Sequence, residues 1–195
     1  MAVPSPTTWT PGNIPSAAQF NADIRDAITF FKAPPRSQVM HNATITRPSR
    51  TSWSLVPWNT EITDTDAMHD NVTNNSRLIA KTAGRYHVWV NITWEDHLVQ
   101  AFEGDRGVQI RKNSAGSIVT GTLIGIDHRH CKTTAVGSQG ASQQGCDGYV
   151  SLAVNDYVEC FVYDADDDTS GGAVGCSLEP QVWAAQRFGM NWISI

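Results

Sequence analysis

The segment Arg85–Trp94 alternates between apolar and polar side chains over its whole length, and this alternation constrains the fold more than any other feature. Successive side chains of a β-strand point to opposite faces, so a period of two over ten residues predicts a strand with one buried face. The face expected inside carries Tyr86, Val88, Val90, Ile92 and Trp94. The opposite face is polar except for Trp89, which is a candidate interface aromatic; the alternative is a single exposed tryptophan covered by a loop.

Other segments show a similar alternation. It is clear in residues 106–113, recurs around a glycine in 117–126, and in 149–164 forms two strands joined at Asn155-Asp156, a tight-turn pair. A weaker alternation begins at residue 36. About eight short strands at regular spacing, preceded by one helix, predict a mainly β protein folded as a β-sandwich. We assign residues 34–195 to this domain.

Residues 1–15 lack regular signals and contain four prolines, with Trp9 as the aromatic residue. Such a segment is expected to be an extended arm that needs a partner surface to become ordered.

The next segment, residues 16–33, has the pattern of a helix. Ser16 stands at the N-cap position, and the residue before a proline leaves helical geometry, so Pro34 and Pro35 end the helix. A stripe with 3-4-3-4 spacing, supported by Ile28 beside it, consists of Ala17, Phe20, Ile24, Ala27 and Phe31. A helix this short is marginal alone, so it either packs on its own domain or forms a coil with identical copies.

Charge and hydropathy exclude two classes of partner. The 195-residue, 21.3 kDa chain has a net charge of −5 and a pI of about 5.6, whereas nucleic-acid-binding proteins concentrate Lys and Arg. Apolar runs stay well below the roughly 18–20 residues that span a bilayer, and the N-terminus lacks the pattern of a secretion signal. We expect neither nucleic-acid binding nor membrane insertion.

Signatures of common catalytic sites are missing. The chain contains no GxSxG, HExxH or GxxxxGK[ST] motif. Glu95 and Asp96 come nearest to a carboxylate pair, but adjacent residues of a strand point to opposite faces. We therefore expect the protein to have no enzymatic activity.

Two clusters are weak candidates for metal binding. His128 and His130 share one face of a strand beside Cys131, with Asp127 as a third ligand, but a solvated loop is the favoured interpretation. An acidic run offers Asp164, Asp166 and Asp168, whose oxygens suit calcium. The spacing of an EF-hand is absent, so we again favour a solvated loop and expect no cofactor.

All four cysteines lie in the last third of the chain, at positions 131, 146, 160 and 176, and no CxxC pair occurs. Four cysteines allow three pairings, and the spacing selects none of them. Unpaired, partly buried thiols are at least as well supported as a bridge between Cys131 and Cys146.

Residues 82–94, TAGRYHVWVNITW, resemble the strand motif of C1q/TNF-like jelly rolls, in which Gly-x-Tyr precedes alternating apolar residues. Gly84, Tyr86, Val88 and Val90 carry this resemblance.

A second family motif, Gly-Asp-x-Val-x-Leu, resembles residues 155–163 through Asp156 and Val158. Asn155 replaces the glycine and Cys160 the leucine, so this match is looser. The resemblance implies a C1q/TNF-like jelly-roll sandwich, preceded by the arm and the short helix, and assembly as a homotrimer.

Residues 8–36 are similar to the opening of virion proteins of tailed phages that infect actinobacteria. These proteins begin with Thr-Trp-Thr-x-Gly, continue with an Ala-Ala-Gln-x-Asn helix and enter a C1q-like domain through prolines; the segment Asp66–Asp70 also resembles them. The resemblance implies a structural component of the virion, assembled in the host cytoplasm.

Three functions follow in order of preference. The leading one is a tail-associated homotrimer that is held to other virion proteins by residues 1–33 and contacts host-surface glycan or protein. Loops on rigid sandwiches commonly supply such contacts, so we expect them from Glu61–Asp70, Lys132–Gly145 and Asp164–Gly172. The second is a capsid decoration or head-fibre protein, and the third an enzyme that degrades surface polymers.

Overall fold

The computed structural model of the chain describes residues 3–42, 52–94, 103–132, 142–166 and 186–195. Helical segments are α1 (Ala17–Phe20), η1 (Asn21–Asp26) and α2 (Ala27–Lys32). The strands are β1 (Arg36–Met40), β2 (Ser54–Leu55), β3 (Thr60–Asp64), β4 (Arg77–Ile79), β5 (Gly84–Trp94), β6 (Glu103–Lys112), β7 (Thr122–Lys132), β8 (Ser142–Leu152), β9 (Tyr157–Asp166) and β10 (Arg187–Ser194).

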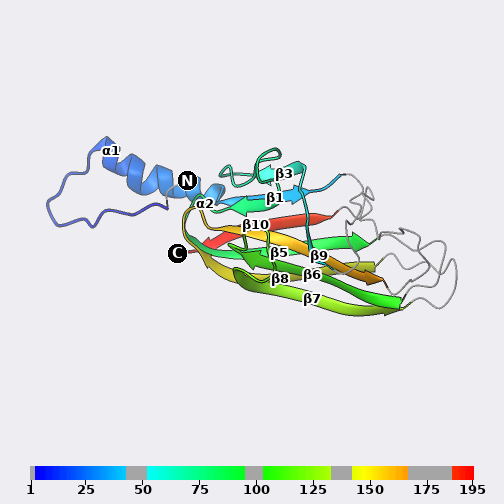
Figure 1. Cartoon of the computed structure of the whole chain (residues 1–195). Helices are drawn as coiled ribbons and strands as arrows, with labels where there is room; N and C mark the ends of the chain where they lie inside the picture. Colours follow the sequence, from blue (N-terminus) through cyan, green and yellow to red (C-terminus); the bar gives the residue numbers. More distant parts are fainter. Residues whose placement is uncertain (1–2, 43–51, 95–102, 133–141, 167–185) are drawn as a thin grey trace.

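The strands form two antiparallel sheets packed face to face (Figure 1). The first sheet has the order β3-β1-β10-β5-β8, and the second has the order β2-β9-β6-β7, with β4 also paired to β9. Successive pairs are nested: β1 with β10, β4 with β9, β5 with β8, and β6 with β7. A chain folded back on itself in this way and rolled into two sheets is a jelly roll.

The core lies between the sheets and contains the inner side chains of both. All five residues that the alternation of 85–94 assigned to the buried face are at most 3% exposed. Trp58 and Phe188 stack at its centre, with ring centroids 5.5 Å apart.

The sandwich has two distinct ends. Strand pairing places Gly84 opposite Leu152 at the end that joins the helix. At the other end, Trp94 pairs with Ser142 and Glu103 with Lys132. Met40 pairs with Arg187 and Gly104 with Asp166 at this second end, while the helix and the arm extend from the first (Figure 1).

The helical segments are continuous along the chain and span residues 17–32. Ser16 forms a capping box with Gln19, as expected for an N-cap residue. The middle turn is π-helical, and the helix stops before Pro34 and Pro35.

The carboxyl group of Asp156, in the turn between β8 and β9, makes the free energy of unfolding depend on pH in the acid range. Partial burial alone would raise the pKa of this carboxyl, but hydrogen bonds from Lys112, Asn113 and the Ala153 N–H outweigh it and lower the pKa to about 2. The folded state therefore releases this proton more readily than the unfolded chain. Its stabilising contribution is complete above the ordinary pKa of about 4 and is lost as the pH falls through about 2.

We expect Asp156→Asn to lower the free energy of unfolding at pH 6 and to lower it clearly less at pH 2.5, where the unfolded chain is protonated but the folded carboxyl is still partly ionised. Urea denaturation at both values measures this difference. An equal effect at both values would contradict the assigned pKa.

Candidate functional site

The N-terminal helix contacts the head through a single buried side chain. Phe30 is 2% exposed and packs edge-on against Trp192 of β10, with ring centroids 4.9 Å apart. The sequence pattern did not select Phe30, because its spacing places Phe31 on the stripe instead.

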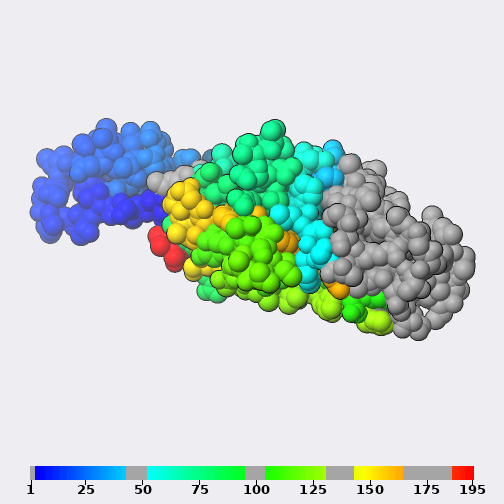
Figure 2. All heavy atoms as spheres, in the orientation of Figure 1, coloured from blue at the N-terminus to red at the C-terminus, as the bar shows by residue number. Residues whose placement is uncertain are grey.

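The remaining apolar side chains of the helix are open to solvent. We call them the helix stripe: Phe20, Ile24, Ile28 and Phe31, which are 48%, 50%, 54% and 75% exposed. The predicted stripe residue Ala27 is half-buried beside them. Figure 2 shows the helix and the arm projecting from one end of the head. Docking on the head therefore leaves the stripe uncovered.

The arm folds back along this helix. The backbone N–H and hydroxyl of Thr7 both donate to Oδ1 of Asp23 at 3.1 Å. Trp9 stacks on Phe20, with ring centroids 6.3 Å apart, and stays 40% exposed. The helix thus supplies a contact surface for the predicted arm within one chain.

Trp89 lies near the middle of β5, on the outer face of the first sheet. A Cβ atom on Gly189 would lie 2.8 Å from its ring, so glycine at this position lets the indole pack against the backbone of β10. Nε2 of His87 lies 2.9 Å from Oδ2 of Asp147, and Tyr149, which is 61% exposed, lies against both His87 and Arg85. We call Arg85, His87, Trp89, Asp147 and Tyr149 the Trp89 face.

The family-motif residues have structural positions. Tyr86, Val88, Val90 and Val158 belong to the core. Tyr86 donates its hydroxyl to the carbonyl of Thr82 at 2.6 Å, and burial raises its pKa well above the ordinary value. Gly84 lies beneath Trp192. Asp156 accepts the hydrogen bonds that stabilise the turn between β8 and β9.

The acidic candidates are not gathered at a metal site within the described residues. Asp164 is fully buried, and its Oδ1 lies 3.9 Å from Nε of Arg106, so the solvated-loop interpretation is wrong for this residue. Asp166 ends β9, and Asp168 lies outside the described residues, as do Glu95 and Asp96.

The two histidines share the outer face of β7, as their spacing indicated, but Asp127 does not join them. Asp127 lies opposite the core residue Val108 and pairs with Arg129 at 2.7 Å. His130 Nδ1 lies 3.0 Å from Oδ1 of Asp105, and His128 packs against Trp53 and Tyr163. In the described part of the chain these residues form aromatic and ionic contacts and no three-ligand cluster.

Cys146 and Cys160 are free thiols. Burial raises the pKa of Cys146 to about 12 and that of Cys160 well above its ordinary value, so neither is a reactive thiolate at neutral pH. Cys176 lies outside the described residues, as does the side chain of Cys131.

The contact loops predicted from the sequence do not share one end. Lys132–Gly145 and Asp164–Gly172 begin at the end opposite the helix. Glu61–Asp70 starts in β3 and leads to the helix-proximal end, where Thr65 hydrogen-bonds to Arg36. Met68 is buried in the core, and Asp64 accepts the N–H groups of Met68 and His69. Glu61–Asp70 is therefore not a free loop, because it begins in β3 and Met68 anchors it to the core; its contact role stays a prediction.

Nested antiparallel pairing in two sheets defines a jelly-roll β-sandwich, which confirms the predicted mainly β, jelly-roll fold. No protein-family model matches the chain, and no curated protein matches its sequence. Among solved structures, it is similar to the globular domain of zebrafish complement 1qA protein, with 13% identity and a TM-score of 0.46. The alignment covers 82% of this chain and 97% of that chain, and the likeness concerns the fold alone. None of the described helices is long and apolar enough to cross a membrane.

Proposed function

We propose that this chain is a non-enzymatic structural protein of a bacteriophage virion, in which three copies assemble, bind other virion proteins through residues 1–33 and project the head towards the host surface. The phage origin rests on the similarity of residues 8–36 to virion proteins. The tail is the favoured location, and the capsid surface is the alternative.

One observation carries the proposal: the two ends of the molecule differ in the way that an anchored, projecting protein requires. The exposed helix stripe lies at one end, and the strand ends Trp94, Lys132 and Asp166 lie at the opposite end. A large exposed apolar stripe is characteristic of an interaction site. Segments at the distal end of a rigid sandwich are suitably placed for contact with a partner.

The Trp89 face supports contact between the heads. Interfaces are enriched in aromatic residues and arginine, and this face presents Trp89, Tyr149 and Arg85 on neighbouring strands of one sheet. Its aromatic side chains are outside the core, so they are available to a second copy without disturbing the fold.

Replacing Trp89 with glutamate is expected to dissociate the heads, because burying an unpaired charge in an interface is costly. Light scattering coupled to size exclusion at micromolar concentration should show a shift from three copies towards one. Val119→Glu is the matched control, since Val119 is 84% exposed in the turn after β6. Trimers in both variants would exclude this face from the interface.

The experiment that tests the whole proposal is cryo-electron microscopy of the intact particle. Three copies at the tail tip or baseplate would support host adhesion. Copies spread over the capsid lattice would replace it with the decoration role, and single copies at either place would overturn the trimer. Exchanging Lys132–Gly145 and Asp164–Gly172 for unrelated loops should reduce adsorption to host cells if the tail role is correct.

A further inference from the structure

The outer face of the second sheet carries a cluster of three aromatic rings towards the end opposite the helix, outside the core. Trp53 stacks on Tyr163 with centroids 5.2 Å apart and an interplanar angle of 29°. His128 lies 6.4 Å from Trp53 and 5.8 Å from Tyr163. Trp53 and Tyr163 are partly exposed and His128 is exposed.

A glycine makes this arrangement possible. Strand pairing places Gly107 of β6 between Tyr163 of β9 and His128 of β7. A Cβ atom on Gly107 would lie 2.7 Å from Trp53 and 2.9 Å from His128, so any other residue would push the rings away from the sheet. The rings thus cover the backbone of β6.

Hydrogen-bonding groups border the rings on one side. Asp105 and His130 form the next outward-facing pair along β6 and β7, with 3.0 Å between Oδ1 of Asp105 and Nδ1 of His130. Their side chains are 45% and 58% exposed. On the other side lies Ile126, which is 50% exposed. An apolar aromatic surface therefore adjoins a carboxylate acceptor and an imidazole.

We propose that Trp53, His128 and Tyr163, together with Asp105 and His130, form a binding platform for neutral saccharides. A pyranose ring has an apolar C–H face that stacks on aromatic rings and a rim of hydroxyl groups that donate to carboxylates and accept from imidazole N–H groups. The carboxylate at the border and the net charge of −5 disfavour phosphate-containing polymers.

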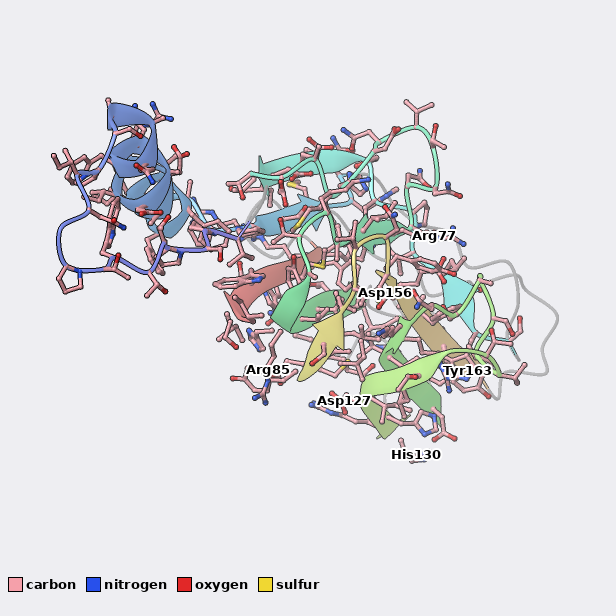
Figure 3. All side chains as sticks on the ribbon, turned by 90° about the vertical axis from the view of Figure 1, so that its left-hand side faces the viewer. Arg77, Arg85, Asp127, His130, Asp156 and Tyr163 are labelled. Atoms are coloured by element: carbon pink, nitrogen blue, oxygen red, sulfur yellow. The ribbon has the colours of Figure 1, made fainter. Side chains whose placement is uncertain are left out.

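The location of the platform agrees with this assignment, which rests on the proposed function. Asp105 lies two residues after the start of β6, at the end of the head opposite the helix. Figure 3 shows Arg85, on the outer face of the first sheet, and Tyr163, on the outer face of the second, on opposite sides of the head. Assembly through the Trp89 face leaves the platform open to a ligand.

Saturation-transfer NMR of the full-length protein with four neutral oligosaccharides tests the platform: chitotetraose, cellotetraose, mannotetraose and galactotetraose. We expect at least one to bind with a Kd of about 0.1–1 mM. Trp53→Ala and His128→Ala should each weaken binding about tenfold, the size of one lost stacking contact. Trp53→Phe, which keeps an aromatic plane, should lose less than Trp53→Ala.

Val154→Ala is the control, because Val154 is an exposed apolar residue in the turn between β8 and β9, outside both the platform and the Trp89 face, and its variant should bind like the native protein. Circular dichroism of every variant separates loss of binding from loss of fold. No transfer to any of the four probes, or unchanged binding by folded Trp53→Ala, would overturn the platform.

The experiments distinguish a wrong saccharide proposal from a wrong proposed function. Tail location with loop-dependent adsorption but no saccharide binding would remove the platform and keep the adhesion role. Saccharide binding that depends on Trp53, in a protein located on the capsid, would keep the platform and remove the tail role.

Discussion

Gly84→Ala is expected to destabilise the head by about 3 kcal/mol or more, although it adds one methyl group. Gly84 has φ +154°, and a Cβ atom there would lie 2.1 Å from Nε1 of Trp192 and 2.6 Å from the carbonyl oxygen of Ser194. The indole cannot simply move aside: Nε1 donates to the carbonyl of Ala83 at 3.2 Å, and the ring packs against Phe30. Urea denaturation measures the loss.

Gly116→Ala serves as the control, because it has the cost of a positive φ without the steric clash that a Cβ atom at position 84 makes with Trp192. Gly116 has φ +76°, and the nearest atom to its added Cβ would be Cδ1 of Leu55 at 3.5 Å, an ordinary contact. This variant should lose only about 1 kcal/mol. Trp192→Leu in the Gly84→Ala background should restore part of the stability, because the smaller side chain leaves room for the methyl group. Equal losses in both alanine variants would contradict the close approach of Trp192.

The part of the fold that the sequence predicted best is the part governed by local periodicity. Alternation over 85–94 placed all five inner side chains correctly, because every second residue of a strand faces the core. The turn at Asn155-Asp156 was equally local: Asn155 has φ 71°, a conformation that asparagine tolerates better than most residues.

Long-range contacts were beyond sequence reasoning. Phe30 and Phe31 are adjacent, and choosing between them requires knowing that Trp192, far along the chain, lies beside the helix. The same holds for Met68, whose segment looked like an exposed turn but enters the core. The acidic composition around Asp164 led to the wrong prediction of a solvated loop. Strand β9 continues to Asp166, so strand pairing places Asp164 opposite Arg106 inside the sandwich.

The proposed saccharide platform could not be predicted from the sequence for the same reason. Its rings come from three separate parts of the chain, at positions 53, 128 and 163, and meet through the pairing of β2, β9, β6 and β7. The sequence showed the shared face of His128 and His130 but gave no sign of their aromatic neighbours.

The helix stripe leads to the second large prediction, which rests on the proposed trimer. Ile24→Glu with Ile28→Glu should raise the dissociation constant of that assembly on the order of 100-fold or more. Both isoleucines are about half exposed in the single chain. Burying each on association contributes in proportion to the apolar area removed from water, and glutamate would bring charges into the same contact. Native mass spectrometry or analytical ultracentrifugation over a dilution series measures the change.

The matched control is Asn21→Glu with Arg25→Gln, which changes the net charge by the same −2 on exposed positions of the same helix outside the stripe. Helix content is comparable in the two variants because glutamate and glutamine are good helix formers. Dissociation of the stripe variant alone would identify the stripe as the contact between copies. Trimers in both variants would mean that the Trp89 face alone holds the heads together, and the stripe would then be left for the neighbouring virion protein. Incorporation of both variants into particles separates these cases, because a stripe that binds another virion protein is required there even when the trimer persists.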